Sequence, residues 1–156
     1  MSVRYIDLMT EITGTLPPYP VAEMGTPVLT PLRKPLSQAR VLIVTSAGVW
    51  LDDEPPFQAL NDMTFRRLPH SVAPSRLRPS HPTPVRRPGE QDINVVYPYQ
   101  RLAELAAEGI IGGVTEYHLS MLGAIKRLRE LVTEMAPGIA ADAKAAGADV
   151  VLHVPL

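Results

Sequence analysis

An uninterrupted apolar run, RVLIVTS at residues 40–46, limits the possible folds more than any other segment of the sequence. β-Branched and other apolar residues follow one another here without the polar alternation of a half-exposed strand. Such a run is typical of a strand covered on both faces, as in a parallel sheet with helices on either side. Ala47 and Gly48 follow, and glycine allows a sharp turn. The run therefore predicts the central strand of an α/β protein.

Strand and helix patterns continue through the rest of the chain. Strands are expected at residues 64–68, 93–97, 117–121 and 150–154. Helices are expected at 3–13, 99–108 and 123–146, the last with a break at Pro137. In that helix, the residues at the spacing of a buried apolar stripe are Ile125, Leu128, Val132 and Met135. This order predicts a three-layer α/β sandwich with a mostly parallel sheet.

Length and composition indicate one cytoplasmic domain. The chain has 156 residues, enough for a single α/β domain over residues 1–156. Its 17 prolines include clusters in two loops, at 15–38 and 69–91. A net charge of −1 gives no general attraction to nucleic acid or membranes, and neither a membrane span nor a signal peptide is recognisable. No cysteine is present, which excludes disulfides, thiolate zinc sites and thiol chemistry within the chain.

The charged residues of the middle of the chain allow two interpretations. Between Met63 and Gly89 there are six arginines and no acidic residue, so this proline-stiffened segment suits an anionic substrate group or an acidic partner. Equally, the arginines could be solvated and paired with acidic residues elsewhere. The adjacent carboxylates at 52–54 favour a solvated loop, because consecutive residues rarely converge on one cation.

Three residues are the candidates for catalysis. His81 lies in a constrained loop between Ser80 and Pro82, where it could act as a general base or as a hydrogen-bond donor to an anion. Asp92 could orient it from the start of the predicted strand 93–97, and His118 could reach the same edge. The alternative is that these histidines are structural or solvent-facing. The histidine spacing matches no metal signature, and we expect neither a metal nor a cofactor.

Several segments also carry a family resemblance. In order, they are YIDLMTEI…LPPYP, RVLIVTSAGVWLDDEPPF, NDMTFRRLP, SHPTP…DINVVYPYQRLAELAAEGIIGGVTEYHLSMLG and AGADVVLHVPL. Together they resemble the selenoprotein B family of glycine, sarcosine, betaine and D-proline reductases, and in particular its small stand-alone homologues. The DINVV…RLAELAAEGIIGG block is the most specific of these segments.

The resemblance implies an oxidoreductase that acts on an amino acid or amine. In the family, a selenocysteine or cysteine just beyond the strand matching residues 150–154 attacks the substrate, whereas this chain contains no cysteine. Thr83 stands where the family usually has a second histidine, and Trp50 where it often has one. The residues carried over to the catalytic and substrate-binding roles are His81, Asp92 and His118, and Ser80 and Asn94. Arg86 and Arg87 of the basic segment complete the expected substrate-binding set.

Two explanations of the missing redox residue remain open. In the first, a UGA codon after Leu156 was read as a stop, and the protein continues through a selenocysteine and a C-terminal helix. In the second, the chain is a redox-dead homologue, either a cofactor-free acid/base enzyme using His81 and Asp92 or a binding and complex-forming subunit. The expected partners are a small amine or amino acid and a reductase subunit or second copy of the chain, but not nucleic acid or a membrane.

Overall fold

The computed structural model describes residues 26, 30–84 and 86–156. The chain divides into two compact units, Met1–Pro31 and Leu32–Leu156, and the fold described below is that of the second. The helix expected at 3–13, and the part of the proline-rich loop 15–38 that precedes residue 30, lie outside the described residues apart from residue 26.

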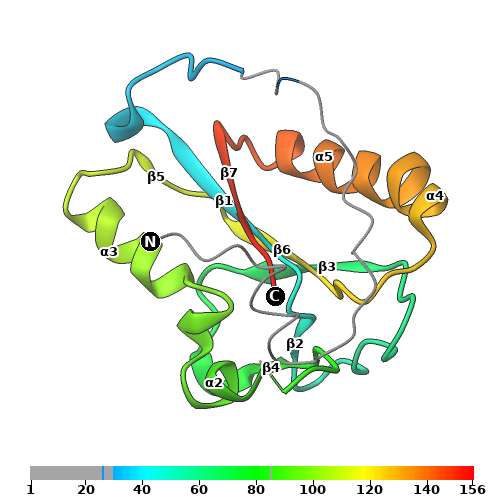
Figure 1. The fold of residues 1–156 in the computed structure, drawn as a ribbon. Coiled ribbons are helices and arrows are strands. Elements are labelled where there is room, and N and C mark those ends of the chain that lie inside the picture. The colour runs from blue at the N-terminus through cyan, green and yellow to red at the C-terminus, as the bar shows by residue number, and fades with distance from the viewer. Residues whose placement is uncertain (1–25, 27–29, 85) are drawn as a thin grey trace, which may run out of the picture. The chain divides into compact units, whose positions relative to one another are not determined.

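A mostly parallel sheet is built around β1 (Arg40–Thr45). β7 (Val150–Val154) pairs with β1 in parallel from Val41 to Thr45. The other edge of β1 pairs in parallel with β5 (Gly113–Val114) at its start and with β6 (Tyr117–Met121) at its end. β3 (Phe65–Pro69) adds an antiparallel strand to β6 (Figure 1). The predicted central strand and mostly parallel sheet are confirmed.

Both faces of β1 are covered, as its continuous apolar run predicts. Val41 and Ile43 belong to a core that includes Leu102 of α3 (Tyr99–Ala107). Leu42 and Val44 face the other way and pack in a second core with Ala143 of α5 (Ala136–Ala145). Figure 1 shows α3 and α5 on opposite sides of the sheet. The predicted three-layer α/β sandwich is confirmed.

A small second sheet extends from the end of β1. β2 (Val49–Leu51) pairs antiparallel with β4 (Leu77–Pro79), which follows a 3-10 turn, η2 (Pro74–Arg76). α2 (Arg86–Gln91) comes next, and another 3-10 turn, η1 (Leu36–Gln38), precedes β1. The proline-rich loop expected at 69–91 therefore contains short elements. Four of its prolines lie at the ends or in the first turns of these elements, and Pro82 and Pro84 lie between β4 and α2.

The strand predicted at 93–97 is wrong. The segment forms a 3-10 turn, η3 (Ile93–Val95), capped by the Asp92 side chain, which accepts a hydrogen bond from the Asn94 backbone N–H. The Asp92 side chain binds the Asn94 N–H, which would otherwise be available to a neighbouring strand. The mostly apolar residues 93–96 therefore form a turn and not an extended strand.

The helix predicted from residue 123 begins five residues later. α4 (Leu128–Glu130) runs into a π-helical turn, η4 (Leu131–Met135), and then into α5. Pro137 lies in the first turn of α5 and lacks a donor N–H, so the wider π turn lets the helix pass the proline without a break. The predicted apolar stripe is wrong in part: Met135 is buried, but Leu128 and Val132 are 65% and 68% exposed.

Candidate functional site

Three of the parallel strands, β1, β6 and β7, have their carboxyl ends at one edge of the sheet, which we call the carboxyl edge. Ser46, just after β1, connects all three. Its backbone N–H donates to the Val154 carbonyl, and its carbonyl accepts from the Gly123 N–H. Its hydroxyl accepts a hydrogen bond from the Leu156 N–H at 2.9 Å. Ligands of open parallel α/β sheets bind outside the carboxyl ends of the strands, so this edge is the candidate site.

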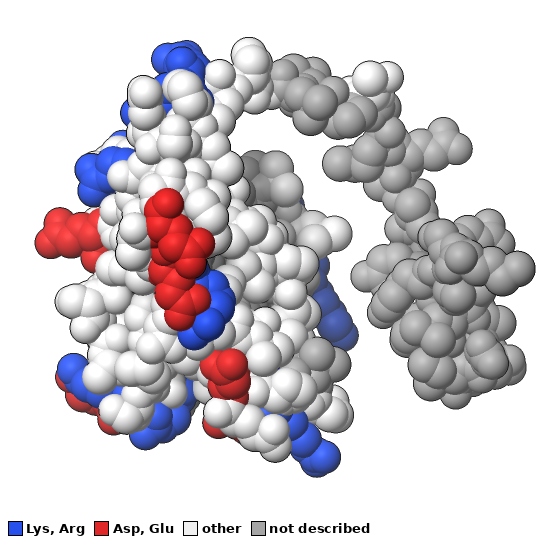
Figure 2. All heavy atoms as spheres, turned by 90° about the vertical axis from the view of Figure 1, so that its left-hand side faces the viewer, with Lys and Arg blue, Asp and Glu red and all other residues white. Residues whose placement is uncertain are grey.

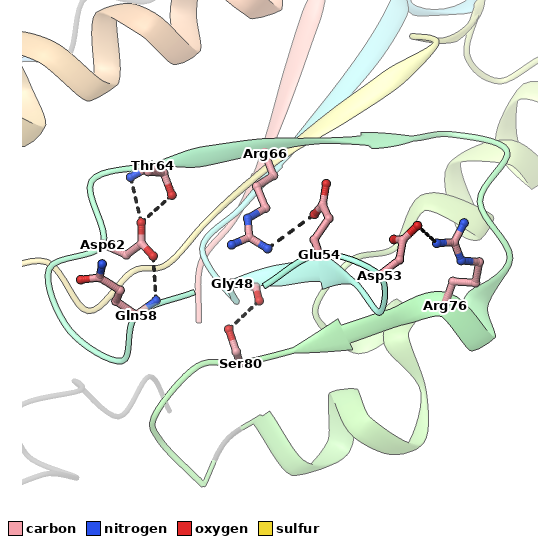
Figure 3. A network of polar contacts seen from close by, with 9 residues as sticks. All are labelled: Gly48, Asp53, Glu54, Gln58, Asp62, Thr64, Arg66, Arg76 and Ser80. Carbon is pink, nitrogen blue, oxygen red and sulfur yellow. Dashed lines mark hydrogen bonds and ion pairs between the residues drawn. The ribbon is translucent and has the colours of Figure 1, made fainter. Parts of the chain in front are cut away.

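A tight turn at Gly48 brings Ser80 to this edge. Gly48 has φ +62°, and a Cβ here would lie 2.7 Å from Leu122 Cδ1 and 2.9 Å from Ser80 Oγ. The Ser80 hydroxyl donates to the Gly48 carbonyl at 2.9 Å (Figure 3). The absence of a side chain at Gly48 is therefore what allows Ser80 to pack against the end of β1.

His81 lies at the same edge. It is buried, and its backbone N–H donates to the Ala47 carbonyl at 3.1 Å. The Nδ1 atom accepts from the Thr83 backbone N–H at 3.4 Å and lies 2.9 Å from Thr83 Oγ1. Burial lowers the pKa of His81. The ring is then neutral with its proton on Nε2, which suits it to donate a hydrogen bond better than to act as a general base.

Asp92 and Asn94 lie elsewhere, beside a cavity of about 420 Å³ between β4, α2 and η3. Asp92 Oδ1 accepts from both the backbone N–H and the side-chain amide of Asn94, at 2.9 Å each. These hydrogen bonds lower the pKa of Asp92. The Asn94 amide also donates to Gln100 Oε1. Within the described residues, no hydrogen bond joins Asp92 to His81, so the geometry gives no support to the expected orienting role.

His118 is fully buried in the core. Its Nδ1 accepts from the Ile43 backbone N–H at 3.1 Å, so the ring proton is on Nε2, 3.1 Å from Nδ1 of His70. Burial and the neighbouring His70 lower the pKa of His118 to about 4. The ring edge also packs against Tyr97. This environment points to a structural role for His118, without contact to solvent.

Most arginines of the basic segment are paired with carboxylates. Arg76 contacts Asp52 and Asp53, and Arg86 contacts Glu90 at 2.8 Å. The remaining pairs are Arg67 with Asp142, Arg78 with Asp52 and Arg66 with Glu54. Figure 2 shows basic and acidic side chains interspersed on the α3 side of the molecule. The geometry thus fits the interpretation of paired arginines and carboxylates. Arg87 of α2 is exposed, and no ion pair is recorded for it within the described part of the chain.

The loop between β2 and β3 is held by a buried carboxylate. Asp62 accepts hydrogen bonds from the Gln58 backbone at 2.7 Å and from the Thr64 backbone at 2.9 Å and its hydroxyl at 2.5 Å (Figure 3). Burial alone would raise the pKa of Asp62, but these hydrogen bonds and the nearby charge of Arg66 bring it below its ordinary value. The loop that leads into β3 is therefore fixed beside the carboxyl edge.

One residue at this edge was missed by the sequence reasoning. The sequence pattern does not separate Arg66 from the five other arginines of the basic segment, but strand alternation turns it toward the α3 face of the sheet, the face on which Leu68 is buried. Its Cζ lies 4.0 Å from the centre of the Phe57 ring. The signal in the sequence was the position of Arg66 inside a strand, between Phe65 and Leu68.

An apolar groove opens on the other face of the same edge. A cavity of about 610 Å³ lies between the sheet and the α4–α5 helical segment, and we call it the α5 groove. Apolar side chains dominate its lining, with Ser46 and His153 among the polar contributions. Val132 and Val151 at this groove are 68% and 48% exposed, far above the exposure of a core residue.

Among the residues that the structure describes, no group of three or more histidine, cysteine, aspartate or glutamate residues is placed to hold a metal ion. The same residues include no helix with the length and apolar character needed to cross a membrane.

Comparison with known proteins gives one informative relative. No family model matches the chain, and no solved structure does. The chain is 30% identical over 126 residues to the D-proline reductase subunit gamma of Acetoanaerobium sticklandii. The match covers 81% of this chain and 52% of that protein, so the chain spans about half the length of its curated relative. The chain is therefore distantly related to a D-proline reductase subunit.

Proposed function

We propose that this chain acts within a reductase of the D-proline, glycine, sarcosine or betaine type, as a selenoprotein B homologue. Its carboxyl edge contributes the surface that holds a small amino acid or amine, and the redox residue comes from outside these 156 residues. The chain contains no cysteine, so the thiol or selenol must be supplied either by a partner subunit or by a longer form of the chain. The cytoplasmic location expected from the sequence stays a prediction.

The α5 groove is the observation on which this proposal depends. It lies at the carboxyl edge, and exposed Val132 and Val151 border it. Contiguous exposed apolar surface is typical of an interaction site. In the described part of the chain, β7 pairs only with β1, so its second edge can accept a further strand. We therefore assign the groove to the polypeptide that carries the redox residue.

The acid/base alternative receives less support from the geometry. Nδ1 of His81 is engaged by Thr83, and Asp92 is engaged by Asn94. His81 and Asp92 therefore do not form the pair of a general base and the carboxylate that orients it. His81 instead suits the binding of a substrate oxygen through its Nε2–H.

The test uses the protein isolated from its own host. Reduction of D-proline, glycine, sarcosine and betaine is measured with dithiothreitol as electron donor, first for the 156-residue chain alone and then for the native complex. We expect activity only in the complex, together with a cysteine- or selenocysteine-bearing polypeptide. Mass spectrometry of the native protein separates the two sources, because a mass well above 17.0 kDa places the redox residue in the same chain.

Substitutions in the groove provide the control. Val132→Glu introduces a charge into the groove and should abolish both complex formation and turnover. Thr133→Glu places the same charge on the neighbouring exposed position, whose hydroxyl donates only to the Arg129 carbonyl, and should leave both intact. Native complex that reduces none of the four compounds would refute the proposed function, and normal activity of Val132→Glu would refute the role of the groove.

A further inference from the structure

Arg66 differs from its neighbour Arg67 in the face of the sheet that it occupies. In the pairing of β3 with β6, Arg66 lies opposite Ser120 and Arg67 opposite Leu119. Arg67 is on the α5 face, where its guanidinium donates two hydrogen bonds to Asp142, at 2.6 and 2.7 Å. Arg66 points from β3 toward the Gly48 turn (Figure 3). The two residues are adjacent in sequence and lie in different environments.

Arg66 is the most buried of the ion-paired arginines of the basic segment, and it has one long carboxylate contact. Its side chain is 15% exposed, whereas the four other ion-paired arginines of this segment are 41–59% exposed. Its one carboxylate contact, to Glu54 Oε2, is long at 3.5 Å. A guanidinium has five N–H donors and is costly to bury without a closely bound anion. Arg66 therefore has donors to offer to a ligand.

The surroundings of Arg66 orient these donors at the carboxyl edge. The Phe57 ring lies under the guanidinium at 4.0 Å and holds it in place. Phe57 itself packs at the Gly48 turn, where its Cδ2 is 3.5 Å from the position a Cβ would take. On the same face, the hydroxyl of Ser120 is fully buried and has no hydrogen-bond partner among the described residues. A buried hydroxyl without a partner is unusual and indicates unused binding capacity.

We propose that Arg66 forms a carboxylate-binding site at the carboxyl edge and that its ligand is a free α-amino acid. The planar guanidinium matches a carboxylate in a bidentate pair, which is a stronger arrangement than the single long contact with Glu54. Glu54 is then placed to attract the positively charged nitrogen of the same ligand. The Ser120 hydroxyl lies at the adjacent strand position. This inference rests on the proposed function, and it defines the substrate class by its α-carboxylate.

Binding can be followed through the single tryptophan, Trp50, which lies two residues after Gly48. D-Proline and glycine are titrated into the folded chain and into the native complex, with D-prolinamide as the ligand that lacks the carboxylate. We expect both amino acids to bind and the amide to bind at least 10-fold more weakly. Arg66→Gln should weaken amino-acid binding at least 10-fold. Arg67→Gln, which removes a neighbouring charge on the other face, should leave it unchanged.

A third variant guards against a folding artefact. Arg66→Lys keeps the charge but loses the bidentate geometry, and we expect intermediate affinity with an unchanged circular dichroism spectrum. Equal binding of D-proline and D-prolinamide, unchanged affinity of Arg66→Gln, or no amino-acid binding by the native complex overturns the assignment. A different result would refute the proposed function alone. In that case amino acids would bind through Arg66, but the native complex would reduce none of the four compounds. Conversely, the complex could be active with a KM that Arg66→Gln does not change. That result would support the proposed function and refute the assignment of Arg66 as the carboxylate site.

Discussion

The buried histidine pair predicts that the protein loses stability in mild acid. His118 Nδ1 accepts from the Ile43 N–H, and Nε2 is 3.1 Å from Nδ1 of His70, so a second proton on His118 would remove the acceptor of a strand backbone group. The pKa of His118 is about 4 in the folded protein, against 6.5 for an exposed histidine. As the pH falls, the unfolded chain therefore takes up the proton first, and folding becomes less favourable.

The magnitude follows from these two pKa values. The contribution of His118 to stability is complete above about pH 7 and declines from pH 6.5 toward pH 4, the range in which only the unfolded state is protonated. Integrated from pH 7.5 to pH 4.5, the loss is about 2.5 kcal/mol. Burial also lowers the pKa of His70, which acts in the same direction. A loss of this size is a large part of the stability of a typical domain.

The assay compares the wild type with His118→Asn. The asparagine oxygen can accept from the Ile43 N–H in place of Nδ1 but does not titrate, so we expect a cost of about 1–2 kcal/mol at pH 7.5 for the lost hydrogen bond to His70. Urea unfolding at intervals from pH 7.5 to 4.5 should show the variant losing about 2.5 kcal/mol less than the wild type. Parallel pH profiles for the two proteins would refute the buried, neutral state of His118.

Three further substitutions test the packing of the edge and its supports. Gly48→Ala should destabilise the protein by about 1–3 kcal/mol in urea unfolding, because φ is +62° and the Cβ would meet Leu122 and Ser80, and a smaller effect would contradict the tight turn. Asp62→Ala should cost about 1.5–3 kcal/mol, since three donors lose their acceptor, and an unchanged melting temperature would show that the loop is held by other contacts. Gly112→Ala should cost at least about 2 kcal/mol because the new Cβ would collide with the backbone of Gln38 and Ala39, and a normal yield of equally stable protein would contradict this close approach.

The central features of the fold could be predicted because their signals are strong and local. The unbroken apolar run gives β1, and the stripe around Leu102 gives α3. Residues 93–97 have the same apolar composition as a strand, but the Asp92 side chain satisfies a backbone donor and starts a 3-10 turn. The exposure of Val132 depends on what covers the α5 groove, which a helical periodicity cannot indicate.

The site was harder to predict because chemical type does not reveal burial. Ser80 and His81 lie at the carboxyl edge, whereas the sequence predicts them beside the start of a strand at residues 93–97 that does not form. As a polar residue, His118 is a candidate for catalysis by its chemical type, yet its ring is fully buried in the core and accepts a hydrogen bond from the Ile43 backbone N–H. Arg66 differs from the five other arginines of the basic segment in its position in the strand register and in its contact with the Phe57 ring, and the sequence shows neither. Which polar residue meets a ligand is decided by tertiary packing, and short motifs do not encode it.

The central place of β1 bears on how the protein is made. The Arg40 backbone N–H is held by Asp149, 109 residues further along the chain, and all of the strands that pair with β1 are synthesised long after it. At about 5–20 residues per second, a ribosome needs on the order of 5–20 s to supply the last of them. During that interval Val41–Thr45 is an apolar strand with open edges, the kind of segment that nucleates aggregation. The yield of this protein in a foreign host should therefore depend on chaperone capacity and translation rate more than on the stability of the finished fold.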